Sequence, residues 1–185
     1  MCRLNQPFIK LFASFAGAIV LTSCATQPPV NFAWWVKLEI EPRGESYVTV
    51  PVTSLDPSIK KLSLLTCDAP EPTFTLEQCS DVATNGARFE VEGDFNGDDK
   101  NDIARAGVAE KHDGTLISVL LIGPAHEPTG HQVLTVPGNG FSALHIQSGL
   151  WWYFCMLCDN GGRVVWNPIQ RMYEIDWGNE EESGA

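Results

Sequence analysis

The sequence predicts a mainly β protein of the α+β class, an antiparallel sheet of successive hairpins with one or two short N-terminal helices. Apolar and β-branched residues alternate along short segments from residue 87 to residue 177. Turn sequences rich in Gly, Asn and Asp separate these segments. Because parallel strands need long crossover connections, such closely spaced strands must form antiparallel hairpins.

The first part of the domain is predicted to contain two strands and a short helix. Alternating apolar residues predict strands over 35–41 and 47–52. Asp56 followed by Pro57 is typical of a helix start, with the Asp as N-cap and the Pro at the first helical position. We expect this helix to end near Leu65, with apolar residues three apart facing the core.

A second short helix and eight strands complete the prediction. Thr75 and Gln78 have the spacing of a capping box, and Asn85-Gly86 is typical of a helix end. After this helix the pattern changes to strand, turn, strand. The predicted strands cover residues 88–92, 103–109, 115–122, 132–136, 141–146, 150–157, 163–166 and 172–177.

Composition limits the class of protein and its partners. The chain has 185 residues, with 12 Lys+Arg against 23 Asp+Glu and a formal net charge of −11. Hydrophobic residues make up 44% and charged residues 19%, a balance typical of a globular protein. The acidity argues against nucleic acid as a partner, because binding to phosphates needs clustered Lys and Arg. The same charge favours a basic protein partner.

The N-terminus has the pattern of a secretory signal. Arg3 and Lys10 are followed by an apolar run over 11–21, which is too short to span a bilayer. The run ends in Leu21-Thr22-Ser23-Cys24, which resembles the lipobox of bacterial lipoproteins. The resemblance implies cleavage before Cys24 and attachment of lipid to its thiol. A plain signal peptide and a buried helix that happens to end in Cys are the alternatives.

These features divide the chain into four parts. Residues 1–23 are the predicted signal peptide, 24–33 the lipidated cysteine and its tether, 34–178 one β-rich domain, and 179–185 an acidic tail. Position 25 is Ala rather than Asp, which in enterobacterial-type sorting resembles cargo for the outer membrane. We therefore expect a protein held in the outer membrane through the lipid on Cys24.

One loop has the residues of a metal site. Oxygen-bearing side chains alternate at Asp94, Asn96, Asp98 and Asp102, and the backbone carbonyl of Lys100 is available between them. A hard cation such as Ca²⁺ takes six to eight oxygen ligands, whereas Mg²⁺ requires stricter octahedral geometry. We therefore predict a structural Ca²⁺ in this loop. The alternative is a solvated acidic hairpin that binds no metal.

The same loop resembles the calcium loop of FG-GAP or VCBS-type repeats. It is not a standard EF-hand, because Arg105 occupies the position of the last Glu ligand. The pattern departs from the family at Asp99, where the family usually has Gly. It spans about residues 88–109 and occurs once, so the propeller architecture of the family is not expected here. The matching residues are Asp94, Phe95, Asn96, Gly97, Asp98, Lys100, Asp102 and Ile103.

The four further cysteines of the mature domain indicate disulfides. An envelope compartment permits them, and Cys67, Cys79, Cys155 and Cys158 allow three connectivities. Cys155 and Cys158 form a C-x-x-C pair, for which zinc binding, redox chemistry and free thiols are alternatives.

No motif in the sequence predicts catalysis. A nucleophile elbow, a metalloprotease helix and a phosphate loop are missing from the sequence, and no small-molecule substrate is indicated.

Two interpretations of function remain open. The first is a non-enzymatic lipoprotein of the cell envelope with a calcium-stabilised β module that is structural or binds a protein. The second is an envelope glycan-binding protein or hydrolase that uses the acidic loop and outward-facing aromatic residues of the segment 151–154. The alternative for this segment is that both of its faces are covered, by the sheet and by the N-terminal helices.

Overall fold

The computed structural model describes residues 34–47, 50–68, 72–127, 129–155 and 160–178. All of them belong to one compact unit, Ala33–Ala185. The predicted signal peptide, tether and acidic tail lie outside the described residues, and these assignments stay predictions. In the described part of the chain, no helix has the length and apolar character needed to cross a membrane.

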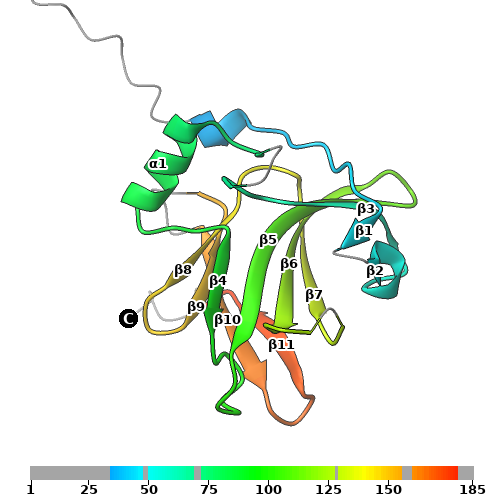
Figure 1. The fold of residues 1–185 in the computed structure, drawn as a ribbon, viewed down its shortest axis with the longest axis vertical. Coiled ribbons are helices and arrows are strands. Elements are labelled where there is room, and N and C mark those ends of the chain that lie inside the picture. Colours follow the sequence, from blue (N-terminus) through cyan, green and yellow to red (C-terminus); the bar gives the residue numbers. More distant parts are fainter. Residues whose placement is uncertain (1–33, 48–49, 69–71, 128, 156–159, 179–185) are drawn as a thin grey trace, which may run out of the picture. The chain divides into compact units, whose positions relative to one another are not determined.

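Five strands form the larger sheet, in which β3, β5, β6 and β7 are neighbours in that order (Figure 1). β3 and β4 share one edge of β5, because β3 pairs with residues 107–111 and β4 with residues 102–105. All pairs are antiparallel. The strands are β3 (Ile59–Leu64), β4 (Glu90–Gly93), β5 (Asp102–Lys111), β6 (Leu116–Pro124) and β7 (Gln132–Pro137).

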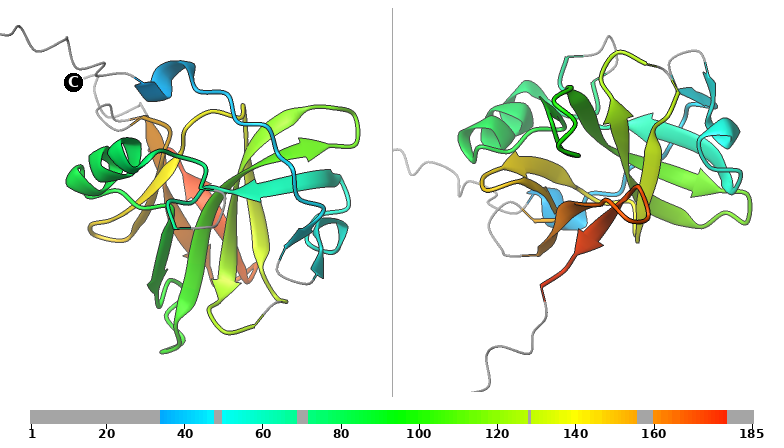
Figure 2. Two further views of the ribbon diagram at one scale, coloured as in Figure 1. Left: turned by 45° about the horizontal axis from the view of Figure 1, so that its top comes forward. Right: turned by 90° about the horizontal axis from the view of Figure 1, so that it is seen from below.

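A second antiparallel sheet has the order β11-β10-β9-β8 and faces the first (Figures 1 and 2). Apolar side chains from the facing surfaces of both sheets form one core cluster, including the fully buried Leu120 and Trp152. The fold is therefore a sandwich of two packed sheets. The strands of the second sheet are β8 (Ala143–Ile146), β9 (Leu150–Tyr153), β10 (Gly161–Asn167) and β11 (Met172–Asp176).

The opposite face of the larger sheet is covered by the N-terminal part of the domain. This part consists of the two-residue strands β1 (Ser46–Tyr47) and β2 (Val50–Pro51) and the 3-10 turn η2 (Val52–Ser54). Tyr47 and Val52 pack there in a second cluster with side chains of β3, β5 and β6. Since both faces of β5 and β6 are covered, most of their residues are buried.

The two sheets are joined at both edges. On one side, Arg88 and Leu144 exchange two backbone hydrogen bonds of 2.8 and 2.6 Å just before β4 and within β8. On the other side, the side-chain amide of Gln132 on β7 donates to the Tyr173 carbonyl and accepts from the Tyr173 N–H of β11, both at 2.6 Å. The Gln132 side chain therefore takes the place of a backbone partner for β11.

Most sequence predictions of elements are confirmed. The mainly β class is confirmed, as are the eight strands after residue 87, although β9 ends at Tyr153, before the predicted end of its strand. The strands after residue 87 belong to two sheets instead of the one sheet expected, because the chain crosses from the first to the second between β7 and β8. The second helix is α1 (Leu76–Thr84), whose Thr75–Gln78 capping box is formed in both directions. The strand expected over 47–52 is replaced by β1, β2 and the start of η2.

The helix predicted from Asp56 to Leu65 is wrong, because residues 59–64 form strand β3. A register shift between Ile59 and Lys61 marks a bulge in its pairing with β5. The bulge places Ile59 and Leu62, three residues apart, in the same buried cluster, which imitates the period of a helix. The Asp56 carboxylate accepts from the Ser58 N–H at 2.8 Å and stabilises a turn instead of a helix start.

The strand predicted over 35–41 is also wrong. A 3-10 helix, η1 (Trp34–Lys37), begins the described domain, and no strand follows it before β1. The ring centroids of Trp34 and Trp35 lie 5.6 and 6.5 Å from that of Phe141. Successive residues of a strand point to opposite faces, so two neighbouring tryptophans of a strand would not both reach Phe141, whereas those of this 3-10 helix do.

Candidate metal centre

The predicted metal ligands lie in the loop between β4 and β5 and at the first residue of β5, Asp102. The loop lies at the end of the sandwich where the β6–β7 and β10–β11 connections also lie (Figure 1). The Asp94 carboxylate organises its first half. Its Oδ1 accepts from the N–H groups of Gly97 and Asp98 at 2.7 and 3.1 Å, and its Oδ2 accepts from the Asp99 N–H at 3.0 Å.

These hydrogen bonds also set the charge of Asp94. Desolvation acts to raise the pKa of Asp94, but the backbone N–H groups of Asp99, Gly97 and Asp98 outweigh it and hold the pKa below its usual range. The carboxylate is therefore ionised at neutral pH.

Two loop residues have left-handed backbone conformations. Gly97 has φ of 79° and Asp99 has φ of 63°. Asp99 is the position at which the sequence departs from the Gly of the FG-GAP pattern. Asp and Asn accept this conformation at lower cost than most other residues, so the loop closes with Asp at this position.

Asp102 is the buried carboxylate of the loop, with 4% of the residue exposed. Its Oδ2 accepts from the Tyr173 hydroxyl at 2.7 Å and from the Phe95 N–H at 3.1 Å. Its Oδ1 accepts no hydrogen bond from the described chain, and no Lys, Arg or His of that part forms an ion pair with it. Asp102 also lines the pocket beside the loop, so its free oxygen is accessible to a cation.

Tyr173 and Gln132 connect this carboxylate to the second sheet. Burial raises the pKa of Tyr173, and the hydrogen bond to Asp102 and the negative charge of that residue raise it further. The hydroxyl therefore stays protonated and donates to Asp102, while Gln132 holds the Tyr173 backbone. Local sequence patterns identify neither residue, because Tyr173 lies 71 positions from Asp102 and Gln132 lies 41 positions from Tyr173, and neither matches a motif.

The donor set fits a hard cation, but the side chains are not gathered into a preformed cluster. Asn96 Oδ1 and Asp98 Oδ1 accept from the Asp98 and Lys100 N–H groups at 2.9 and 3.0 Å. Asp98 Oδ2 and Asp102 Oδ1 accept no hydrogen bond within the described chain. Among the described residues, no three His, Cys, Asp or Glu side chains are placed to hold a metal ion. Calcium binding therefore requires the loop side chains to turn toward the ion.

A pocket of about 1100 Å³ adjoins the loop. Asp98 and Lys100 line one side of it, and His131, Trp166 and Tyr173 line others. Both ring nitrogens of His131 are buried and make no hydrogen bond within the described chain. Burial lowers the pKa of His131, the Arg105 charge lowers it further, and the Asp102 charge opposes them. The pocket therefore has a neutral imidazole close to the acidic loop.

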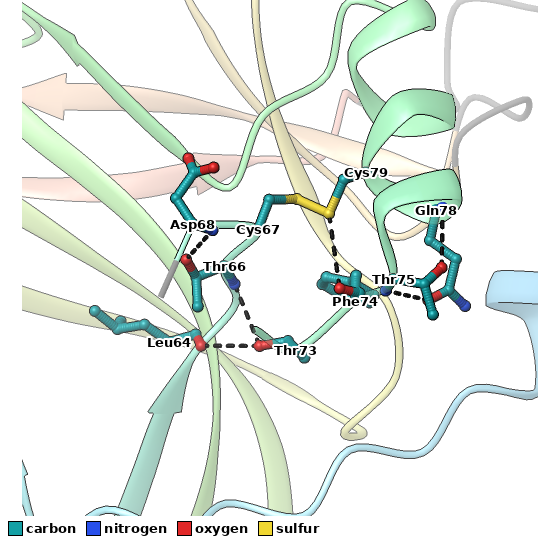
Figure 3. Close-up of a disulfide and its surroundings, with 9 residues drawn as sticks. All are labelled: Leu64, Thr66, Cys67, Asp68, Thr73, Phe74, Thr75, Gln78 and Cys79. Atoms are coloured by element: carbon teal, nitrogen blue, oxygen red, sulfur yellow. Dashed lines mark hydrogen bonds between the residues drawn. A yellow bond between two sulfur atoms is a disulfide. The ribbon is translucent and has the colours of Figure 1, made fainter. Parts of the chain in front are cut away.

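The cysteine predictions are confirmed for one pair. Cys67 and Cys79 form a disulfide with their Cα atoms 5.9 Å apart, and it links the end of β3 to α1 (Figure 3). Cys155 is also in a disulfide. Cys158 lies outside the described residues, and so does Cys24. The prediction for each of these two cysteines stays a prediction.

The aromatic segment alternates as predicted. Trp152 is fully buried and Phe154 packs against the same core. Trp151 and Tyr153 are partly exposed on the opposite face of the second sheet, with ring centroids 5.8 Å apart. Arg163 lies opposite Trp151 in the register with β10. This face therefore combines aromatic rings with a polar side chain.

Comparison of the chain with protein-family models, with curated proteins and with solved structures found no match.

Proposed function

We propose that this chain is a lipid-anchored, non-enzymatic protein of the cell envelope whose β domain is stabilised by Ca²⁺ and binds a protein partner. The lipobox-like sequence ending at Cys24 and the small residue after it support an outer-membrane anchor. The net charge of −11 supports a basic partner, because opposite charge speeds the encounter of two proteins.

The buried carboxylate of Asp102 is the observation that carries the calcium part of this proposal. It lies in a loop that resembles the FG-GAP calcium loop, and it has no cationic partner in the described chain. Asp94, Asn96, Asp98 and the Lys100 carbonyl would complete an all-oxygen ligand set, which Ca²⁺ prefers. When bound, the ion would neutralise this cluster and tie the β4–β5 loop to Tyr173 of the second sheet. Its role here is structural.

Terbium luminescence tests the ion site directly. Tb³⁺ occupies calcium sites and emits when an excited aromatic ring lies close to it. Tyr173 forms a hydrogen bond to Asp102, and the Trp166 ring centroid lies 4.9 Å from that of Tyr173. Both rings are therefore close enough to the site to transfer excitation energy to Tb³⁺. We expect sensitised Tb³⁺ emission that is lost when Ca²⁺ displaces the Tb³⁺. The Ca²⁺ concentration needed should be roughly 0.1–1 mM, the range of dissociation constants of extracellular calcium modules.

Variants at two neighbouring residues compare a predicted ligand with a loop residue outside the ligand set. Asp98→Ala removes a predicted ligand and should abolish the emission. Asp99→Gly removes the same charge from a residue outside the ligand set and relieves the φ of 63°, so it should keep the emission. Equal emission from both variants would contradict the site.

Incorporation of a labelled fatty acid tests the lipid anchor. We expect the full-length protein to incorporate the label and the variant Cys24→Ala to lose it.

A second candidate function is glycan binding at the outer face of the second sheet. The observation that favours it is the partly exposed pair of Trp151 and Tyr153 beside Arg163. Aromatic rings of this kind stack on sugar rings. Peptidoglycan fragments should then quench tryptophan fluorescence, and Tyr153→Ala should weaken the quenching with an unchanged melting temperature. Quenching that is identical in Tyr153→Ala and the unchanged protein would remove this candidate.

A further inference from the structure

The two sheets separate along one edge, and there the outer edge of β4 has no partner strand within the described chain. The ladder between the β4 segment and β8 contains one pair, Arg88 with Leu144. Beyond that pair β4 continues as Glu90–Gly93 beside an opening of about 540 Å³, which Glu92, Leu144 and Ile146 help to line. β4 lies beside β8 in the ribbon view (Figure 1). The position next to β4 is therefore open where β8 no longer pairs.

Hydrogen-bond alternation determines which backbone groups of β4 face this opening. Phe89 accepts from the Ala106 N–H of β5 at 2.9 Å, so Phe89, Val91 and Gly93 direct their backbone groups toward β5. Glu90 and Glu92 direct theirs the other way, as Arg88 does toward Leu144. In the described chain, nothing accepts from or donates to these outward groups of Glu90 and Glu92.

The side chains beside this edge define the chemistry of an occupant. Val91 is buried, and Ile146 of β8 is 50% exposed next to the opening. On the other face, Glu90 and Glu92 are both exposed. Arg105 pairs with Glu90 at 2.6 Å, whereas Glu92 forms no ion pair within the described chain. A strand added along Glu90–Gly93 would place basic residues next to the two glutamates.

We propose that the outer edge of β4 binds an extended segment of a basic partner protein by antiparallel strand addition, with Lys or Arg opposite Glu90 and Glu92. Strand addition at an open edge uses backbone hydrogen bonds for affinity and alternate side chains for specificity. The negative charges disfavour pairing of two copies through this edge, because like charges opposite each other repel. The inference specifies the partner-binding part of the proposed function and does not depend on calcium or lipid.

A capped ten-residue peptide of alternating valine and lysine tests the proposal against the ¹⁵N-labelled protein. We expect the amide resonances of Glu90 and Glu92 to shift and saturate at millimolar peptide. The same peptide with glutamate in place of lysine should not bind. No shift at either amide up to about 5 mM peptide would overturn the proposal, as would shifts that appear on raising the protein concentration alone.

N-methylated peptides test the geometry of pairing. In an antiparallel pair, the lysines opposite Glu90 and Glu92 direct their N–H groups to β4, and the valines direct theirs away. Methylation of these lysine nitrogens should weaken binding about 10- to 100-fold, since each lost hydrogen bond costs roughly 3- to 10-fold. Methylation of the valine nitrogens should change it little. Equal loss for both peptides would overturn the proposal.

A matched pair of protein variants tests the same edge. Glu92→Pro removes one outward N–H that β5 does not use, and it should weaken peptide binding roughly 3- to 10-fold more than Glu92→Gln, which keeps the N–H. Melting curves show whether each variant is folded. Unchanged binding in a folded Glu92→Pro would overturn the proposal.

The peptide and terbium experiments distinguish failure of the two proposals. If the peptide does not bind but terbium does, only the proposed partner site at the edge of β4 is rejected. If terbium does not bind, only the calcium site is rejected.

Discussion

Asp102→Asn is expected to abolish the stabilisation of the domain by calcium while leaving the domain itself folded. Asparagine keeps an oxygen that can accept from the Tyr173 hydroxyl and the Phe95 N–H, and it removes a buried charge. The weaker hydrogen bonds and the relief of desolvation act in opposite directions. In chelator we therefore expect the free energy of unfolding to stay within about 1 kcal/mol of the unchanged protein.

The difference should appear when calcium is added. With a dissociation constant of roughly 0.1–1 mM, 10 mM Ca²⁺ stabilises the unchanged domain by about 1.4–2.7 kcal/mol. Asp102→Asn should gain none of this. The measurement is a pair of denaturant titrations of each protein, one in chelator and one in 10 mM Ca²⁺. Equal calcium stabilisation in both proteins would contradict the role of Asp102 as a ligand.

Tyr173→Phe is the matched control for this change. It removes the hydroxyl that donates to Asp102 but keeps the carboxylate as a ligand. A hydrogen bond to a charged group contributes roughly 1.5–3 kcal/mol, so the variant should be less stable by a similar amount in chelator and in calcium. Its gain from calcium should remain. The two variants therefore separate the loss of a ligand from the loss of a supporting hydrogen bond.

The sequence predicted the strands well wherever local patterning and tertiary burial agree. β5 and β6 have long apolar runs because both of their faces are covered, one by the second sheet and the other by the cluster around Tyr47 and Val52. The prediction failed where packing between distant residues decides the local conformation. Trp34 and Trp35 adopt a helical turn because both contact Phe141, which lies more than 100 positions later.

In the acidic loop, too, local sequence predicts some features and contacts between distant residues determine others. Its turn residues, its oxygen-bearing side chains and the unusual backbone of Asp99 follow from the local sequence. The neighbours that make Asp102 a buried carboxylate do not, because Tyr173 and Gln132 come from β11 and β7. Local sequence therefore predicts which residues could bind an ion, whereas the burial of Asp102 depends on contacts between distant strands.

Removal of the Cys67–Cys79 disulfide is expected to cause the largest loss of stability. The two cysteines are separated by 12 positions, and closing a loop of this length stabilises a fold by about 3 kcal/mol in the chain-entropy model. For a domain of this size the double variant Cys67→Ala/Cys79→Ala should melt roughly 6–12 °C lower. A change in melting temperature below about 2 °C would contradict this prediction.

The loss should be greatest at α1, because few other contacts hold this helix, among them the hydrogen bond of 3.2 Å from Trp34 Nε1 to Asp81. α1 has nine residues, of which Val82 alone is fully buried, and Leu76 is 87% exposed. A helix of this length is marginal by itself, and its Thr75–Gln78 capping box stabilises only the first turn (Figure 3). Hydrogen exchange should therefore increase over residues 76–84 in the double variant and remain slow in β5 and β6. Because Cys155 is also in a disulfide, the double variant isolates the Cys67–Cys79 bond in a way that reduction of the whole protein cannot.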